Sequence, residues 1–125
     1  MGKKFLIDTN ILIDAQMKKL PEKGLKFLAD VINENFTVSF ITYIEFLGYK
    51  DATATTEEFI ALADVLEINK NIIDKCIALR KTNKIKLPDA IIAATAMVND
   101  MTLISRNISD FGNINDIQVV NPWEI

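Results

Sequence analysis

The stretch FLIDTNILID over residues 5–14 constrains the fold more than any other part of the chain. Its first three residues are all apolar and lack alternation, which is typical of a parallel strand buried on both faces. Thr9 and Asn10 are residue types that cap helices, so we expect a helix from Ile11 onward. Asp8 then lies at the carboxyl end of a strand, where open α/β sheets bind their ligands. An aspartate there can also serve only the dipole of the next helix, so the rest of the chain must decide.

The composition is typical of one well-packed domain, which we expect to span residues 1–125. Half of the residues, 50%, are hydrophobic, which is enough for a sizeable core. No stretch approaches the roughly 18 successive apolar residues of a membrane span. The apolar run after Lys3 and Lys4 is too short for a secretory signal. We therefore expect a cytoplasmic protein with no membrane partner.

The absence of histidine restricts the chemistry that this chain can perform. With no histidine and a single cysteine, Cys76, the sequence excludes Ser-His-Asp triads, imidazole acid–base pairs, internal disulfides and thiolate metal clusters. The net charge of −3 argues against a general polyanion binder, although a local basic patch is compatible with it. Any catalysis must therefore use carboxylates, lysines, hydroxyls or a hard metal ion.

Predicted strands alternate with predicted helices along the rest of the chain. We expect strands over residues 36–41, 101–105 and 117–120, and helices over 21–33, from 42 to about 49, from 55 to 66, over 70–82 and over 89–98. Leu25 and Leu62 are assigned to apolar helix faces, and Ile73, Cys76 and Ile77 are expected to point inward. The pattern predicts an α/β fold with a central parallel sheet of four to five strands and helices on both faces.

Four acids stand at predicted strand ends or helix starts: Asp8, Glu45, Asp89 and Asp110. Glu45 can instead close a capping box with Thr42, Asp89 can favour a helix dipole, and Asp110 can be a turn residue. In a parallel sheet these positions share one rim, where crowded carboxylates raise each other's pKa or recruit a cation. Oxygen ligands alone favour Mg²⁺ or Mn²⁺, which can activate water for displacement at phosphorus. The acids are therefore compatible with a nuclease.

Four blocks of the sequence resemble those of a PIN domain, in the same order. They are LIDTN at 6–10, TYIE at 42–45, LPDAIIAA at 87–94, and LISRN at 103–107 followed by Asp110 and Phe111. The closing VNPWE at 120–124 extends the resemblance over nearly the whole chain. The length and the lack of additional domains most resemble the VapC-type toxins of prokaryotic toxin–antitoxin pairs.

The resemblance implies an endoribonuclease that hydrolyses RNA phosphodiester bonds with Mg²⁺ or Mn²⁺. Asp8, Glu45 and Asp89 would hold the metal and position the attacking water. Asn107 stands where many members have an acid, so Asp110 would serve there through a water or an indirect contact. The residues expected to orient the acids or to contact the substrate are Thr9, Asn10, Ser105, Arg106 and Asn107.

A basic cluster precedes Asp89, formed by Arg80, Lys81, Lys84 and Lys86. It can be the solvated end of a helix, where cations are favoured, or a contact for the phosphate backbone beside the acids. Among single residues, Arg106 is the better candidate for a phosphate contact. Both interpretations of the cluster stay open at this point.

The resemblance also implies two protein partners, a second copy of the chain and a cognate antitoxin. The antitoxin would place a helix in an apolar groove. Candidate lining residues of that groove, which are otherwise core residues, are Phe46, Leu47, Tyr49, Phe59 and Ile60.

Two other function classes compete with the toxin. A receiver-type phosphoacceptor domain has this length and a strand-end aspartate, but it needs an acidic pair after the first strand and a lysine after the last. Here Asp8 stands alone, and the last strand is followed by Asn121 and Pro122. A PIN fold without catalysis, binding only RNA or protein, is compatible with the change at Asn107. The RNA target and the number of metal ions are not fixed by the sequence.

Overall fold

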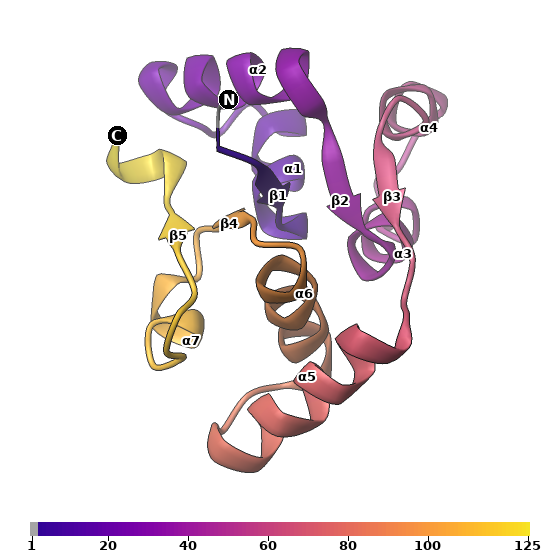
Figure 1. Ribbon diagram of the computed structural model, residues 1–125. Helices are drawn as coiled ribbons and strands as arrows, with labels where there is room; N and C mark the ends of the chain where they lie inside the picture. The colour runs from indigo at the N-terminus through magenta and orange to yellow at the C-terminus, as the bar shows by residue number, and fades with distance from the viewer. Residues whose placement is uncertain (1–2) are drawn as a thin grey trace.

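The computed structural model describes residues 3–125, and its elements alternate between strand and helix (Figure 1). The strands are β1 (Phe5–Ile7), β2 (Thr37–Ser39), β3 (Asp64–Leu66), β4 (Thr102–Ile104) and β5 (Val119–Val120). The helices are α1 (Thr9–Gln16), α2 (Glu22–Asn35), α3 (Phe40–Leu47), α4 (Ala54–Ile60), α5 (Lys70–Thr82), α6 (Leu87–Val98) and α7 (Ile108–Phe111), followed by the 3₁₀-helix η1 (Pro122–Glu124).

All strand pairs in the described part of the chain are parallel. Strands β1, β4 and β5 form one hydrogen-bonded sheet in the order β1-β4-β5, and β2 pairs with β3 in a second. Strand β2 packs beside β1, so the two sheets continue each other in space (Figure 1). The predicted α/β class, with four to five parallel strands, is confirmed.

Two hydrophobic cores lie on opposite faces of the strands. Leu6 and Leu103 pack against α5 and α6, whereas Ile7 and Ile104 pack against α1, α2 and α3. Successive strand residues point to opposite faces, so each strand must be apolar on both. This explains the unbroken apolar run in β1 and confirms helices on both faces of the sheet.

Two predicted elements end earlier than expected. The strand expected over 36–41 stops at Ser39, because the Ser39 side chain accepts from the Thr42 N–H and caps α3. The helix expected through residue 66 ends at Ile60, and its capping box is Thr53–Thr56. Residues 64–66 form β3 instead, because they pair with β2. The short elements α7 and η1 were not predicted.

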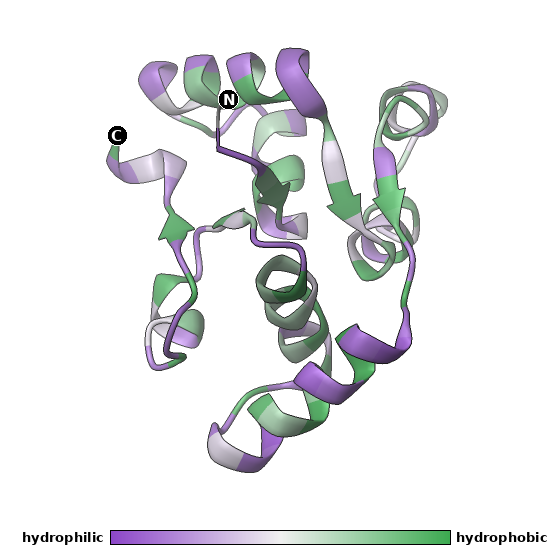
Figure 2. Ribbon diagram, viewed as in Figure 1, coloured by the Kyte–Doolittle hydropathy of each residue, from purple (hydrophilic) through white to green (hydrophobic). Residues whose placement is uncertain are grey.

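The predicted inward face of α5 is partly wrong. Ile73 and Ile77 are 40% and 50% exposed, whereas Ile72, Cys76 and Leu79 are buried. Leu25 and Leu62, also expected on apolar faces, are exposed as well. The alanines of α6 behave as expected: Ala90, Ala93, Ala94 and Ala96 are fully buried against the sheet. Figure 2 shows that hydrophobic and hydrophilic residues alternate along α5.

The end of the chain packs on α2. Gly24 is buried in this helix, and a Cβ there would lie 2.1 Å from the Pro122 carbonyl oxygen. Only a glycine permits so close an approach of η1. No helix within residues 3–125 is both long enough and apolar enough to cross a membrane.

Candidate active site

The carboxyl ends of β1, β2 and β4 bring together the polar residues that the sequence singled out. Asp8 follows β1 and donates its backbone N–H to the Ile104 carbonyl at the end of β4. Ser105 continues from β4, and Ser39 leads from β2 into the helix that carries Glu45. Because the strands are parallel, these three turns lie at one rim of the molecule.

Asp8 is a buried carboxylate whose two oxygens are both engaged. Oδ1 accepts the Thr9 N–H at 2.7 Å and so caps α1, in place of the predicted Thr9 or Asn10 cap. Oδ2 accepts from Ser105 Oγ at 2.7 Å and from Asn10 Nδ2 at 3.3 Å. Asp8 therefore does cap α1, but the cap uses only the Oδ1 oxygen. The Oδ2 oxygen is held by Ser105, which follows β4, and by Asn10 of α1, both at the rim.

The acids at the rim act on one another electrostatically. Burial raises the pKa of Asp8 to about 6, hydrogen bonds from Ser105 and Thr9 oppose the rise, and the charges of Asp89 and Glu45 add to it. The pKa of Asp89 is also raised, chiefly by burial and then by the charges of Asp110 and Glu45, while Lys86 lowers it. All four predicted acids thus lie within electrostatic reach of Asp89 or Asp8.

Glu45 does not cap its helix. The N-cap of α3 is Ser39, so the alternative interpretation of Glu45, a capping box with Thr42, is excluded. Glu45 Oε1 instead accepts from Thr9 Oγ1 at 2.6 Å, which links α3 to α1. Thr9 Oγ1 and Thr42 Oγ1 lie 3.1 Å apart, and Thr42 Oγ1 and Ser39 Oγ 3.4 Å apart. A hydroxyl has one hydrogen, so when Thr9 donates to Glu45, the Thr42 hydroxyl donates to Thr9.

Asp89 lies in the first turn of α6 and lines a hollow together with Asp110 of α7. In the described part of the chain, neither carboxylate has a hydrogen-bond donor among the protein side chains or an ion-pair partner. Asn107 is the N-cap residue of α7, and its backbone N–H donates to Ser105 Oγ at 3.0 Å. Asp110 lines the hollow together with Asp89, whereas Asn107 is not among the lining residues.

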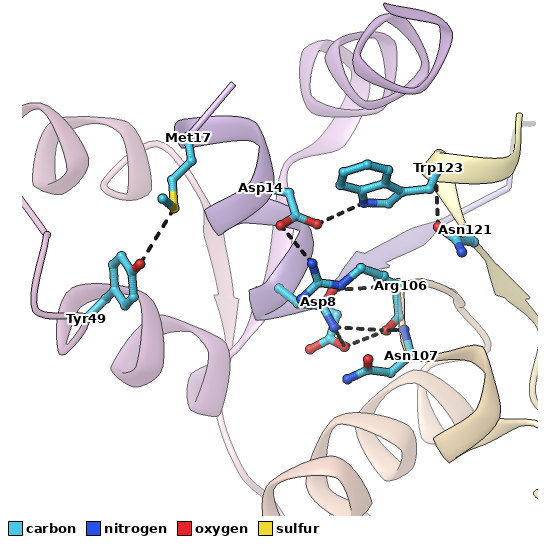
Figure 3. Close-up of polar contacts among 10 residues, drawn as sticks. Asp8, Asp14, Met17, Tyr49, Arg106, Asn107, Asn121 and Trp123 are labelled. Carbon is cyan, nitrogen blue, oxygen red and sulfur yellow. Dashed lines mark hydrogen bonds and ion pairs between the residues drawn. The ribbon is translucent and has the colours of Figure 1, made fainter. Parts of the chain in front are cut away.

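The turn after β4 is held by a partly buried ion pair (Figure 3). Arg106 Nη1 lies 3.1 Å from Asp14 Oδ1, and the Asp14 side chain is only 4% exposed. Asp14 Oδ2 accepts from the Trp123 indole N–H at 2.9 Å. The backbone N–H of Arg106 donates to Asn10 Oδ1 at 3.3 Å. One side of the Arg106 guanidinium is thus committed to Asp14 and not to a substrate.

The comparisons with known proteins agree with this arrangement. The sequence profile of the PIN domain matches residues 5–116, which is most of the chain. The chain belongs to the PIN-domain family. No curated protein sequence matches this PIN domain significantly.

Solved structures of similar sequence are toxin–antitoxin complexes. A toxin–antitoxin complex from Klebsiella pneumoniae contains a chain 35% identical to this PIN domain, with a TM-score of 0.79, covering 98% of this chain and 100% of that one. A chain of VapBC-1 from nontypeable Haemophilus influenzae is 26% identical, with a TM-score of 0.79, covering 97% and 98%. VapBC2 from Rickettsia felis, bound to a promoter DNA fragment, is 20% identical over 94% and 97% with a TM-score of 0.78, and shows the same fold. The resemblance to a PIN domain of VapC type is confirmed.

The acids of this PIN domain offer only oxygen ligands. Within residues 3–125, no three acidic side chains are grouped closely enough to hold one ion jointly. Mg²⁺ typically keeps several waters and takes only one or two carboxylates directly, so such spacing suits it. Hard divalent ions also prefer carboxylate oxygens over other donors. The donor set therefore fits Mg²⁺ or Mn²⁺.

Sequence reasoning missed the residues that hold this site together, above all Asp14, Trp123, Ser39 and Thr42. A signal existed for Asp14, because it follows the buried Ile11 by three positions and so shares its helix face. Ser39 also had a local signal, because serine is a favoured N-cap and its partner Thr42 is three positions away. For Trp123 and Thr42 no local pattern was available, since their partners Asp14 and Thr9 come from distant segments.

Proposed function

We propose that this PIN domain is a metal-dependent endoribonuclease and the toxin of a type II toxin–antitoxin pair. The observation that carries the proposal is that Asp8, Glu45 and Asp89, from three separate sequence blocks, lie at one rim of the sheet within electrostatic reach of one another. Asp8 is held there by three donors and Glu45 by Thr9. A structural acid needs no such convergence.

The four acids would have different roles, which depend on their surroundings. Asp8 and Asp89 would hold Mg²⁺ or Mn²⁺, with Glu45 and Asp110 acting on its water ligands. When bound, such an ion lowers the pKa of a coordinated water and neutralises charge at the scissile phosphate. Ser105 and Asn10 keep Asp8 in one orientation, and Thr9 does the same for Glu45. Removing these donors would misplace the acids without removing any of them.

An apolar groove would receive the antitoxin. It lies between α1, α2 and α4 and is lined by Leu12, Ala15, Gln16, Leu25, Leu28, Ala29, Ile32, Thr55, Thr56 and Phe59. Of the groove residues expected from the sequence only Phe59 lines it, whereas Phe46 and Ile60 are buried in the core. A helix with apolar anchors would fill such a groove. The toxin–antitoxin neighbours support a protein partner of this kind.

The test is cleavage of a mixed cellular RNA pool by the purified protein, freed of any antitoxin. We expect discrete fragments with Mn²⁺ or Mg²⁺ and none with chelator. Asp89→Asn should reduce cleavage by at least about 100-fold, in line with the loss of a group that acts on the reacting centre. Asp30→Asn, at an exposed position of α2, is the matched control and should cleave like the wild type.

A non-catalytic RNA- or protein-binding module is the second candidate, because Asn107 offers no carboxylate in the fourth block. Folded wild-type protein that cuts no RNA with either ion would favour this module. The receiver-type alternative is excluded, since the chain belongs to the PIN-domain family.

A further inference from the structure

A hollow beside the acids has cations on one side. It is lined by Arg80 of α5, by Lys84, Ile85 and Lys86 of the loop between α5 and α6, by Asp89 of α6 and by Asp110 of α7. The loop continues directly into the helix that carries Asp89 (Figure 1). The cations and the candidate catalytic acids thus share one cavity.

Arg80, Lys84 and Lys86 form no ion pair in the part of the chain that the structure describes. Among residues 3–125, the only ion pairs are Lys70 with Asp74 and Arg106 with Asp14. Arg80, Lys84 and Lys86 therefore have no carboxylate within 4.0 Å, although the chain has a net charge of −3 and acids are abundant. The hollow is lined by three cations and two acids, and because the cations are not ion-paired they can attract an anion.

The helix dipole accounts for only part of the cluster. Arg80 and Lys81 lie in the last turn of α5, where cations are favoured. The helix ends at Thr82, and the dipole effect decays within the last turn, so Lys84 and Lys86 gain nothing from it. Lys81 is also absent from the lining of the hollow. The positions of the two loop lysines are therefore better explained by an anion that binds from outside the protein.

We propose that this hollow binds a backbone phosphate of the RNA strand, adjacent to the phosphate that is cleaved. The inference rests on the nuclease function proposed above. An RNA strand that approaches Asp89 and Asp110 is repelled by both acids, and cations on the same cavity wall offset that repulsion. Contacts of this kind fix the position of the strand without reading its bases. Lys84 and Lys86 are thus positioning residues for the substrate.

The test compares Lys84→Gln/Lys86→Gln with Lys81→Gln, a control that removes one charge from the same segment outside the hollow. Binding of a short single-stranded RNA to metal-free protein is measured over a range of salt concentrations. The double variant loses the contact with one phosphate, so its slope of log K against log salt should fall by about 0.7. The control should keep the wild-type slope.

A second measurement locates the contact on the RNA. Single linkages are replaced by uncharged methylphosphonates, one position at a time. One linkage beside the cleaved bond should weaken binding to the wild type several-fold and leave binding to the double variant unchanged. In cleavage assays the double variant should show a raised KM with kcat largely retained.

The two ways in which the inference can fail are distinguishable. If the wild type cleaves RNA but the double variant keeps its salt slope and KM, the phosphate site is wrong and the nuclease stands. An equal loss of slope in Lys81→Gln would show that the lysines act through a diffuse positive potential and not through a defined phosphate site. If the wild type neither binds nor cleaves RNA, the proposed function and this inference both fail. Circular dichroism of each variant shows that a loss is not due to unfolding.

Discussion

At the scale of single residues, Asp8 has two opposing effects on the stability of the fold. Its Oδ1 caps α1, which stabilises the helix, but its burial makes the negative charge costly. The hydrogen bonds from Ser105 and Thr9 recover only part of that cost, because the pKa still rises to about 6. An acid that destabilises its own fold when ionised is typical of a site that expects a cation.

Asp8→Asn should therefore stabilise the metal-free protein at neutral pH. The pKa in the folded state lies above the ordinary 3.8, so the stabilisation from protonated Asp8 is complete below about pH 4 and lost as pH rises through about 6. The rise corresponds to about 3 kcal/mol, and asparagine retains the cap, so we expect a gain of about 1–3 kcal/mol at pH 7.5. Urea unfolding at pH 4 and pH 7.5 measures it.

Two further measurements separate this charge effect from a purely structural role of Asp8. The difference between the two proteins should shrink toward zero at about pH 4, because the wild-type carboxyl is then protonated. Added Mg²⁺ should raise the melting temperature of the wild type and leave that of Asp8→Asn unchanged. An equal loss of stability in Asp8→Asn at both pH values would instead make Asp8 a structural cap.

At the scale of elements, the short helix η1 connects the end of the chain to the site. It packs on α2 at Gly24, and its Trp123 donates to Asp14 of α1. Asp14 in turn pairs with Arg106, whose backbone N–H donates to Asn10 beside Asp8. The turn after β4 is thereby held between α1 and η1, which keeps Ser105 in reach of Asp8.

Gly24→Ala tests this connection. Alanine is favoured over glycine in a helix by about 1 kcal/mol, but overpacking typically costs about 1–3 kcal/mol, and here the new Cβ would meet the Pro122 carbonyl at 2.1 Å. We expect the melting temperature to stay level or fall, and η1 to shift. Trp123 is the only tryptophan, so its fluorescence should move to the red as the indole loses Asp14.

The matched control for this variant is Asn33→Ala, at an exposed position of the same helix. It should leave the emission unchanged. A higher melting temperature in Gly24→Ala with unaltered emission would show that η1 does not depend on the glycine.

At the scale of the whole molecule, exposed apolar residues occur on two faces of the protein. One face is the groove between α1, α2 and α4, where Leu25 is 46% exposed. The other is the outer side of α5, where Ile73 and Ile77 lie one turn apart. Exposed apolar patches often serve association, so we propose the α5 face as the contact of the predicted homodimer.

The variant Ile73→Lys/Ile77→Lys should convert a dimer into a folded monomer. Two charges on each copy would repel across a twofold interface and remain unpaired when buried. Sedimentation of the wild type and the variant measures the change, and thermal unfolding confirms that the variant is folded. Asn71→Lys adds a charge to another side of the same helix and should stay dimeric. A monomeric wild type would contradict the assignment.

The sequence by itself determined those features whose causes are local. The apolar run of β1 matches residues 5–7, and α5 begins and ends where Asn69 and the periodicity of residues 70–82 predict. Asp8 after β1 and Asp89 in the first turn of α6 also stand where the sequence predicts, whereas Glu45 lies near the end of α3 and not at its start. Local propensity and chain position are enough for such features, because neighbouring residues alone decide them.

The tertiary structure decided everything that depends on a distant partner. Strand β3 exists because residues 64–66 pair with β2, and α5 turns a different face inward than its composition indicates. Glu45 bonds to a hydroxyl 36 positions away instead of capping its helix, and Asp14 meets partners 92 and 109 positions away. Burial and hydrogen bonding are properties of the packed chain, so they fix these roles only once the segments meet.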